Sequence, residues 1–289
     1  MSRMACRRPT VFGVLSASPR ARLVSRLDLG FGRSAALWRN DRDRVAYECP
    51  EGHTFSLYLE GGLGTRRVDG RDERGWPGAL CVMPHGRRSD WEITAPFAFV
   101  HLYVPAEELG RAFAETCDRD ARLMDLAEVT FGAAPGPAAA LRGLARATLA
   151  GDALAAETAM AETMARFFAD PRWGGPARAP LRGGLAPHIG RRVVDHVESA
   201  LAGPVRLGDL ARLADLSAAH FHRAFRASFG VSPHAFVARR RAARVKALLR
   251  GPDPIAAIAL ACGFSSQSHF THAFKAATGA TPAAYRAAL

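Results

Sequence analysis

The sequence predicts an α+β protein of two domains: an N-terminal antiparallel β-barrel or sandwich followed by helices, and a C-terminal all-α domain. Three observations lead to this prediction. Short apolar or alternating runs between turn residues occupy the first hundred positions, helical periodicity replaces them after Pro105, and one helical unit occurs twice near the C-terminus. A chain of 289 residues is also long enough for about two ordinary domains.

Strands are expected between about Arg20 and Val104, where runs of a few residues are separated by Gly, Asp, Arg and Pro. Such short, regularly interrupted runs are typical of an antiparallel sandwich or barrel. The predicted strands are 35–38, 53–59, 79–83, 90–93 and 97–104. After Pro105 a helical spacing follows, first around Leu109 and Phe113, then over 141–149 and 154–168.

A linker is expected where Gly, Pro and Arg dominate, between Asp170 and Pro187. This composition continues neither a helix nor a strand. The predicted organisation is therefore a first domain at 1–170, a linker at 171–186 and a second domain at 187–289. The helix predicted near 189–201 is expected to pack against the first copy of the repeat.

The repeat pairs equivalent aromatic and turn residues of two copies at a spacing of 49 positions. The pairs are Phe221 with Phe270, Phe225 with Phe274, Gly230 with Gly279, Pro233 with Pro282, and Phe236 with Tyr285. Upstream the spacing is 48, and the change falls at Ser217, which matches the pair Ser265 and Ser266. A turn tolerates such an insertion.

Each copy reads as helix, turn, helix. In the first, a helix from about Leu207 to Ala214 is followed by Ser217, a residue suited to cap the next helix by accepting a free backbone N–H. Phe221 and Phe225 then share one buried face. Gly230 ends that helix, and Ser232-Pro233 opens another.

The polar face opposite the phenylalanines is the candidate DNA-reading surface, because the second helix of a helix-turn-helix unit enters the major groove. Arg223 can pair with a guanine and Gln267 with an adenine, since their forked groups match those base edges. Arg226 and Lys275 are candidate phosphate contacts. The alternative is a face that is merely solvated. The other candidate base contacts are Ala219, His222, Ser268, Thr271 and His272.

A connecting helix is predicted over 233–249, about 26 Å long at 1.5 Å per residue. This length resembles one turn of B-DNA, so one chain could contact two successive major-groove segments. The helix carries a run of cations, of which Arg240 is a candidate phosphate contact. A run of charges on a helix is also common on a simple solvated face.

Basic charge is concentrated in the second domain. Residues 187–289 hold 14 Lys and Arg against 5 Asp and Glu, whereas the whole chain has a net charge of +12. Such an excess is typical of proteins that bind a polyanion. Double-stranded DNA is the predicted partner, and binding without sequence preference remains an alternative. No basic amphipathic helix stands free for a membrane surface.

These residues resemble the AraC/XylS family of bacterial transcription regulators. The resemblance rests on the stretch from Ile258 to Phe270 and on Phe274-Lys275, Thr278-Gly279, Thr281-Pro282 and Tyr285-Arg286. It implies base contacts at the positions named above for the two reading helices. Ala219 offers only a methyl group, so the preferred operator is not transferable. The family also suggests a homodimer, with RNA polymerase as a further candidate partner.

The first domain is similar, more loosely, to the cupin-like regulatory domain of the same family, through 53–62, Gly78 and Pro84-His85-Gly86. In metal-binding cupins a histidine ligand follows this glycine-proline motif. Here Ser89 occupies that position, and a His-x-His is missing from the strand at His53. A metal-dependent enzyme is therefore disfavoured, and no catalytic residue, metal or cofactor is predicted.

A small organic effector is expected in the first domain, because its strands supply aromatic surface with a few polar tips. The alternative is a filled core. An enzyme is a third interpretation, based on residues that lie close together in the sequence: Asp41, Asp43, Glu48, Glu51 and His53. The candidate effector residues are His53, Tyr58, Trp91, His101 and Tyr103.

Five scattered cysteines without a CxxC motif indicate neither a disulfide framework nor a zinc cluster. Cys262 lies on an apolar helix face and is expected to be a small core residue. The N-terminus lacks the apolar run of a signal peptide, and no stretch is long enough to span a bilayer. A cytoplasmic location is the resulting expectation.

Overall fold

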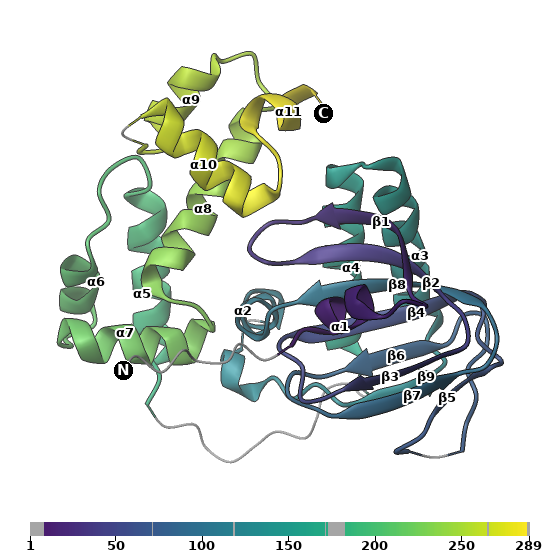
Figure 1. The fold of residues 1–289 in the computed structure, drawn as a ribbon. Coiled ribbons are helices and arrows are strands. Elements are labelled where there is room, and N and C mark those ends of the chain that lie inside the picture. The colour runs from purple at the N-terminus through teal and green to yellow at the C-terminus, as the bar shows by residue number, and fades with distance from the viewer. Residues whose placement is uncertain are drawn as a thin grey trace, which may run out of the picture. The chain divides into compact units, whose positions relative to one another are not determined.

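A computed structural model describes residues 9–70, 72–117, 119–170, 172, 183–264 and 266–287. Contacts group them into two compact units (Figure 1). The first takes 9–28, 32–106 and 126–172, and the second takes 29–31, 107–125 and 183–287. The predicted division at 170 and 187 differs from this grouping, because 29–31 and 107–125 pack with the C-terminal helices. Most of the predicted linker lies outside the described residues.

The first unit is built on two antiparallel sheets. The larger has the order β1-β2-β8-β4-β6-β9 and the smaller the order β3-β7-β5. The strands are β1 (Arg22–Asp28), β2 (Ser34–Asn40), β3 (Asp43–Tyr47), β4 (His53–Gly61), β5 (Thr65–Arg67), β6 (Leu80–Met83), β7 (Ser89–Ile93), β8 (Phe97–Val104) and β9 (Val129–Gly132). This architecture confirms the predicted antiparallel β fold of the N-terminal part.

The core of the first unit lies between the sheets. In the register of the large sheet, Phe99 of β8 lies opposite Trp38 of β2 and Tyr58 of β4, so all three side chains project from one face. They join Trp91 of β7 in one buried aromatic cluster. Helix α1 (Val11–Ala17), capped by Thr10, adds its buried residues to the same cluster.

Two helices, α3 (Pro135–Ala150) and α4 (Ala153–Ala169), belong to the same unit, and α3 contacts β1, β2, β4 and β8 of the large sheet (Figure 1). Alternation along β4 turns Phe55 away from the aromatic cluster, and its ring lies 4.7 Å from that of Phe167 in α4. Gly151, with φ of 70°, allows the sharp turn between the helices. Asp152 then caps α4.

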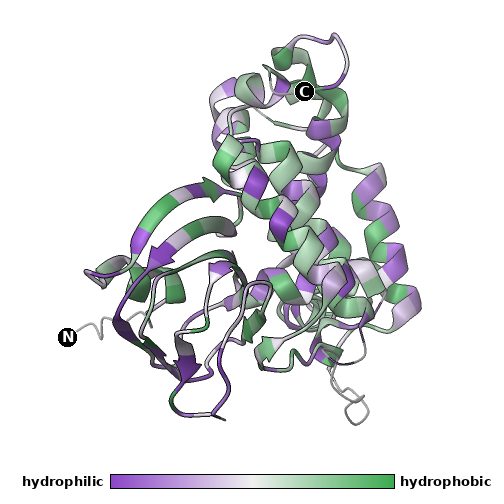
Figure 2. Cartoon of the chain, turned by 90° about the vertical axis from the view of Figure 1, so that its right-hand side faces the viewer, coloured by the Kyte–Doolittle hydropathy of each residue, from purple (hydrophilic) through white to green (hydrophobic). Residues whose placement is uncertain are grey.

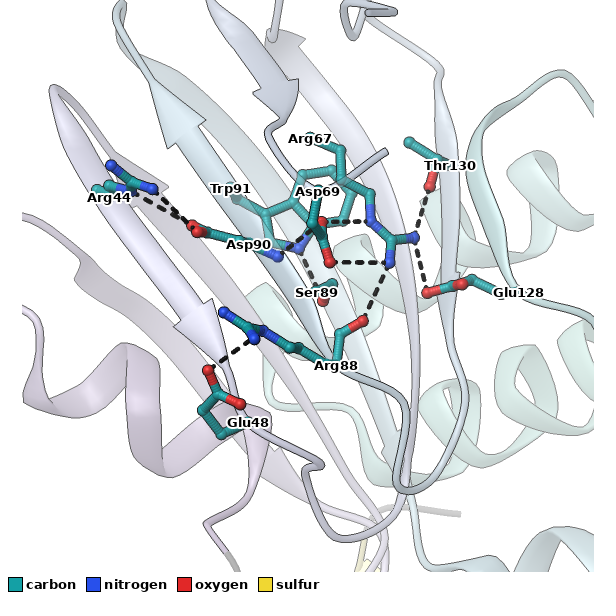
Figure 3. A network of polar contacts seen from close by, with 10 residues as sticks. All are labelled: Arg44, Glu48, Arg67, Asp69, Arg88, Ser89, Asp90, Trp91, Glu128 and Thr130. Atoms are coloured by element: carbon teal, nitrogen blue, oxygen red, sulfur yellow. Dashed lines mark hydrogen bonds and ion pairs between the residues drawn. The ribbon is translucent and has the colours of Figure 1, made fainter. Parts of the chain in front are cut away.

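A polar network around Arg67 ties together three strands of the first unit (Figure 3). Its guanidinium donates to Asp69 at 2.9 Å, to Thr130 of β9 at 3.2 Å and to the carbonyl oxygen of Arg88 at 3.0 Å. Glu128 lies 2.7 Å from the same group. Because the Arg67 side chain is only 11% exposed, these contacts satisfy a charge that is largely withdrawn from water.

The second unit is helical. Its elements are α2 (Ala106–Cys117), the short 3₁₀ helix η1 (Ala121–Leu123), α5 (Pro187–Ser199), α6 (Leu207–Leu213), α7 (Ala218–Phe229), α8 (Pro233–Leu248), α9 (Ile255–Ala261), α10 (Gln267–Thr278) and α11 (Pro282–Ala287). Hydrophilic and hydrophobic bands alternate along the helices in Figure 2, as expected for helices that bury one face. The predicted C-terminal all-α domain with two helix-turn-helix units is confirmed.

Several observed elements were not predicted from the sequence. Every predicted strand has an observed counterpart, but α1, β1, β3, β5 and β9 were not anticipated. Strand β1 exposes Leu23 and Val24, at 41% and 46%, so two of its apolar residues face water and the usual inside-outside alternation is absent from its first half. Strand β9 has four residues and interrupts the region where a helical spacing was expected.

Candidate nucleic-acid interface and effector site

Helix α7 of the second unit has the form predicted for a reading helix. Ser217 caps it by accepting the backbone N–H of His220 at 3.3 Å. Phe221 and Phe225 are completely buried. The opposite face leaves Arg223 exposed. Of the other predicted contacts on α7, Ala219 and Arg226 are exposed and His222 is half-buried.

Helix α10 repeats this construction. Ser266 is its N-cap and accepts the N–H of His269 at 3.2 Å, while Phe270 and Phe274 are buried. Gln267 opens the helix and is exposed. The Thr271 hydroxyl donates to the Gln267 carbonyl at 2.9 Å, so its hydrogen is engaged within the helix. The remaining predicted contacts on α10, Ser268, His272 and Lys275, are all exposed.

The two copies also bury their aromatic residues alike. Phe225 meets Phe236 edge-on with ring centroids 5.4 Å apart, and the equivalent pair, Phe274 and Tyr285, meets edge-on at 5.5 Å. In the first copy, Val193 of α5 joins the same core, which confirms the predicted packing of that helix. Cys262 is fully buried, as predicted for a small core residue.

Helix α8 connects the two copies and has 16 residues, which corresponds to a length of about 24 Å. Several of its cations are engaged inside the second unit. Arg240, a predicted phosphate contact, pairs with Glu198 of α5. Arg241 donates to the carbonyl oxygens of Leu201 at 3.2 Å and Gly203 at 2.6 Å. A DNA phosphate must therefore compete with internal partners along much of this helix.

A cavity of about 380 Å³ lies beside α8, and residues from both copies of the repeat line it. Its wall includes His222 of α7, Arg241 of α8 and His269 of α10. No sequence pattern indicates this meeting, because His222 and His269 belong to different copies. Spacing within one helix reports which residues share its face, whereas the approach of two helices depends on packing.

The histidines of the repeat do not gather into a ligand set. Within the described part of the chain, no group of three or more His, Cys, Asp or Glu is arranged to hold a metal ion. His220 and His269 are both exposed. The ring of His269 meets Phe264 edge-on at 5.7 Å, a packing contact of the kind expected from its place in the repeat.

The candidate effector residues of the first unit separate into two groups. Tyr58, Trp91 and His101 line a cavity of about 30 Å³, room for about one water molecule. Tyr103 is near them, since its hydroxyl lies 3.0 Å from Nδ1 of His101 and accepts the Trp38 indole N–H at 3.0 Å. In this conformation the barrel interior is filled.

His53 departs from the expected inward position. It lies opposite Val104, whereas Ser56 lies opposite His101, so alternation along β4 turns His53 to the other face of the sheet. Its Nδ1 accepts the backbone N–H of His85 at 3.2 Å. His53 and Tyr58 are five positions apart, and because this separation is odd their side chains project from opposite faces of a regular strand.

Burial keeps two histidines of the first unit, His53 and His101, neutral. It lowers the pKa of His101 to about 3. For His53, burial and the neighbouring His85 lower the pKa to about 4. Removing an imidazolium from water disfavours the charged form. Both side chains therefore serve as neutral hydrogen-bonding groups at neutral pH.

Two of the acids behind the enzyme interpretation, Asp43 and Glu48, are engaged in separate contacts. Asp43 accepts hydrogen bonds from Ser18 at 2.6 Å and Asn40 at 2.9 Å, and Glu48 pairs with Arg88 at 3.3 Å. These contacts tie strand and loop ends together. They do not aim the carboxylates at one point with His53, which bonds to the backbone of His85.

Comparison with known proteins addresses the second unit. A family model described as a helix-turn-helix domain matches residues 210–288. The chain is 32% identical over 93 residues to the probable transcriptional regulator LumQ of Photobacterium leiognathi, covering 32% of this chain and 38% of LumQ. It is 34% identical over 100 residues to the HTH-type transcriptional regulator MtrA of Neisseria gonorrhoeae, covering 34% of this chain and 32% of MtrA.

Among solved structures, an AraC-type transcriptional regulator from Chromobacterium violaceum is 29% identical, with a TM-score of 0.33, over 35% of this chain and 90% of that one. The chain spans about a third of the length of the curated relatives it matches. The second unit thus contains a helix-turn-helix domain. Its motifs confirm the AraC-type resemblance for this C-terminal third.

None of the described helices combines the length and the apolar composition that a membrane-spanning helix requires.

Proposed function

We propose that this protein is a transcription regulator that binds double-stranded DNA, with α7 and α10 in successive major-groove segments. One observation supports this most directly. Two capped helices of the same construction bury paired phenylalanines and leave polar faces exposed, and a single continuous helix joins them. Helix-turn-helix proteins present such faces to base edges.

The proposed roles follow from side-chain chemistry. Arg223 and Gln267 are the principal base contacts, since guanidinium and carboxamide groups can pair bidentately with guanine and adenine. Ala219, His222, Ser268, Thr271 and His272 complete the reading faces. Lys275 and Arg226 are phosphate contacts near the ends of α10 and α7. Arg240 also contacts a phosphate if its pairing with Glu198 opens.

The first unit is proposed to modulate DNA binding, through a small organic effector or through a homodimer. The aromatic cluster around Tyr58, Trp91 and His101 supports the effector, because it combines apolar surface with polar groups. Any ligand larger than water must displace these side chains. If the full chain is monomeric and a metabolite screen leaves its melting temperature unchanged, this part of the proposal fails.

The experiment for the main proposal is selection of binding sites by the full chain from random DNA duplexes, followed by titration of the selected site. We expect one enriched sequence. Arg223→Ala and Gln267→Ala should each weaken binding to it by about 10- to 100-fold, since a good bidentate pair contributes about 1–3 kcal/mol of discrimination. Arg212→Ala is the matched control, because Arg212 is an exposed arginine of α6 outside the reading face.

A protein that binds DNA without sequence preference gives a different result. It enriches no sequence, shows the steep salt dependence of phosphate contacts, and is indifferent to Gln267→Ala. That outcome would reject the specific reader. Recruitment of RNA polymerase is a separate expectation, tested by transcription in vitro from a promoter that carries the selected site.

A further inference from the structure

Helix α2 places two acidic side chains on arginines of the DNA-binding helices. Both contacts lie within the second unit. Glu107 lies 3.6 Å from the guanidinium of Arg226 in α7. Glu108, the next residue, pairs with Arg239 in the middle of α8. The two acids thus engage one cation on the first reading helix and one on the connecting helix.

The pairs differ in their exposure to water. The side chains of Arg226 and Glu107 are 59% and 45% exposed, so this pair is weak and can be opened by a competing anion. Arg239 and Glu108 are only 10% and 4% exposed. Their charges neutralise each other where water does not reach, so Arg239 cannot contact a phosphate while α2 stays docked.

Backbone packing fixes the position of α2. Gly230 ends α7 with φ of 75°, and a Cβ atom there would lie 2.8 Å from the backbone nitrogen of Arg111 and 3.0 Å from the carbonyl carbon of Gly110. Real Cβ atoms essentially never approach another atom to 2.8 Å. The approach of Glu107 and Glu108 is therefore set by two backbones in direct contact, and not only by the reach of flexible side chains.

A second segment covers the same arginine. The guanidinium of Arg239 lies 4.4 Å from the ring centroid of Phe31. The Phe31 backbone N–H donates to the carbonyl oxygen of Ala276 in α10 at 2.9 Å. At Gly30, a Cβ atom would overlap the Ala277 backbone at 2.2 Å. Arg239 is thus enclosed by an acid from α2 and an aromatic ring that is anchored to the second reading helix.

We propose that Glu107 and Glu108 compete with DNA for Arg226 and Arg239, and so determine how many phosphates the helix-turn-helix domain neutralises. This inference rests on the proposed DNA binding. Each arginine that stays paired with an internal carboxylate leaves one phosphate with its counterions, so DNA binding releases about one counterion fewer. The docked helix therefore weakens DNA binding without touching a base, and its release strengthens binding.

Chain connectivity shows what could release α2. Strand β8 supplies Phe99 and His101 to the lining of the barrel cavity and ends at Val104. Pro105 alone separates this strand from Ala106, where α2 begins. A ligand that displaces the cavity side chains of β8 acts on the strand that leads directly into the two acids. The competition is therefore a route by which an effector changes affinity for DNA.

The test compares the salt dependence of DNA binding by the full chain and its variants. Glu107→Gln keeps the shape of the side chain and removes its charge. We expect the slope of log affinity against log salt to steepen by about 0.9, which corresponds to an approximately eight-fold gain in affinity at 0.1 M salt relative to 1 M. Arg226→Ala should leave the wild-type slope nearly unchanged, because Glu107 already neutralises that arginine, and it should cancel the steepening when combined with Glu107→Gln.

Glu115→Gln is the matched control, since Glu115 lies on the same helix and pairs with Arg111, not with a proposed DNA contact. An equal steepening by Glu115→Gln, or none by Glu107→Gln, overturns the proposal. A purely structural role for Glu107 predicts a lower melting temperature with an unchanged slope. Glu108→Gln, checked for folding by circular dichroism, should steepen the slope further once Arg239 is released.

Heparin separates this proposal from the proposed function, because it is a polyanion without a base sequence. If no variant binds DNA but Glu107→Gln still steepens the salt dependence of heparin binding, the competition stands and the DNA-reading function fails. If the wild-type chain binds DNA and the variant changes neither slope, the competition fails and the DNA-reading function stands.

Discussion

Two buried histidines make the first unit sensitive to acid. His101 and His53 have pKa values lowered to about 3 and about 4, against about 6.5 for an unfolded chain. The folded state therefore binds fewer protons than the unfolded state between these values. The stability that comes from keeping these histidines neutral is fully present above about pH 6.5 and is lost as the pH falls toward about 4.

The expected loss is about 1.4 kcal/mol per pH unit for each histidine in that interval. Urea unfolding at pH 7.5, 6.0 and 5.0, followed by tryptophan fluorescence, measures it. His101→Gln should reduce the slope, because one of the two titrating groups is gone. His188→Gln, which changes an exposed histidine at the start of α5, should retain the wild-type slope. Equal slopes for all three proteins would contradict the assignment.

Arg67 is the second residue with a large expected effect. Arg67→Ala leaves Asp69 and Glu128 without their common partner (Figure 3). We expect the free energy of unfolding to fall by about 2 kcal/mol, because the remaining groups are still partly desolvated. Arg44→Ala breaks an ion pair whose arginine is 66% exposed, and should lower the free energy of unfolding much less than Arg67→Ala does. Similar losses in the two variants would mean that the Arg67 network stabilises the fold no more than a single exposed ion pair does.

At single residues, the sequence predicted some features of the site and missed others for identifiable reasons. Exposure of Arg223 followed from helical spacing, since it lies opposite the buried Phe221 and Phe225, whereas Gln267 is exposed because it is the first residue of α10. The pairing of Arg239 with Glu108 could not be predicted, because Glu108 precedes Arg239 by 131 positions and no local sequence pattern joins them. The inward placement of His53 was wrong because alternation along β4 puts it on the face opposite to Tyr58.

Among the elements, the two cap serines offer a matched pair of tests. Ser217→Ala and Ser266→Ala each remove the oxygen that accepts the third backbone N–H of a reading helix. We expect each to lower the unfolding free energy of the second unit by about 1 kcal/mol. Thermal unfolding followed by circular dichroism at 222 nm measures the change.

Ser199→Ala is the control for these caps. It also removes a serine hydroxyl, but that hydroxyl donates to the carbonyl of His196 at the end of α5 and caps neither reading helix. Unchanged stability in both cap variants would show that the observed capping bonds contribute nothing to the helices. Affinity for DNA should fall with the caps as well, since frayed first turns no longer hold Ala219 and Ser268 in place.

At the scale of elements, prediction succeeded where chemistry and periodicity agreed. Helices α7, α8 and α10 begin after a serine cap and bury residues at helical spacing, so their starts were anticipated within a residue. Strands β3, β5 and β9 are five, three and four residues long, too short to show a periodicity of their own. They form because neighbouring strands offer partners, which no local pattern records.

For the whole molecule, the decisive feature is that α8 runs unbroken between the two reading units. A helix of about 24 Å does not stretch, so it fixes the separation and the rotation of α7 relative to α10. The DNA must therefore present two half-sites at one spacing, near one helical turn. This predicts that base pairs inserted between the half-sites of the selected site prevent simultaneous binding by both units.

Insertion of 5 base pairs places the half-sites on opposite faces of the duplex, and insertion of 10 restores the face but adds about 34 Å. With a rigid spacer, both insertions should reduce affinity to that of a duplex with one half-site only. Fluorescence anisotropy with the full chain measures the three affinities. If the 10-base-pair insertion retained the affinity of the original site, the two units would be flexibly joined, and α8 would not act as the ruler that its continuous hydrogen-bonded structure implies.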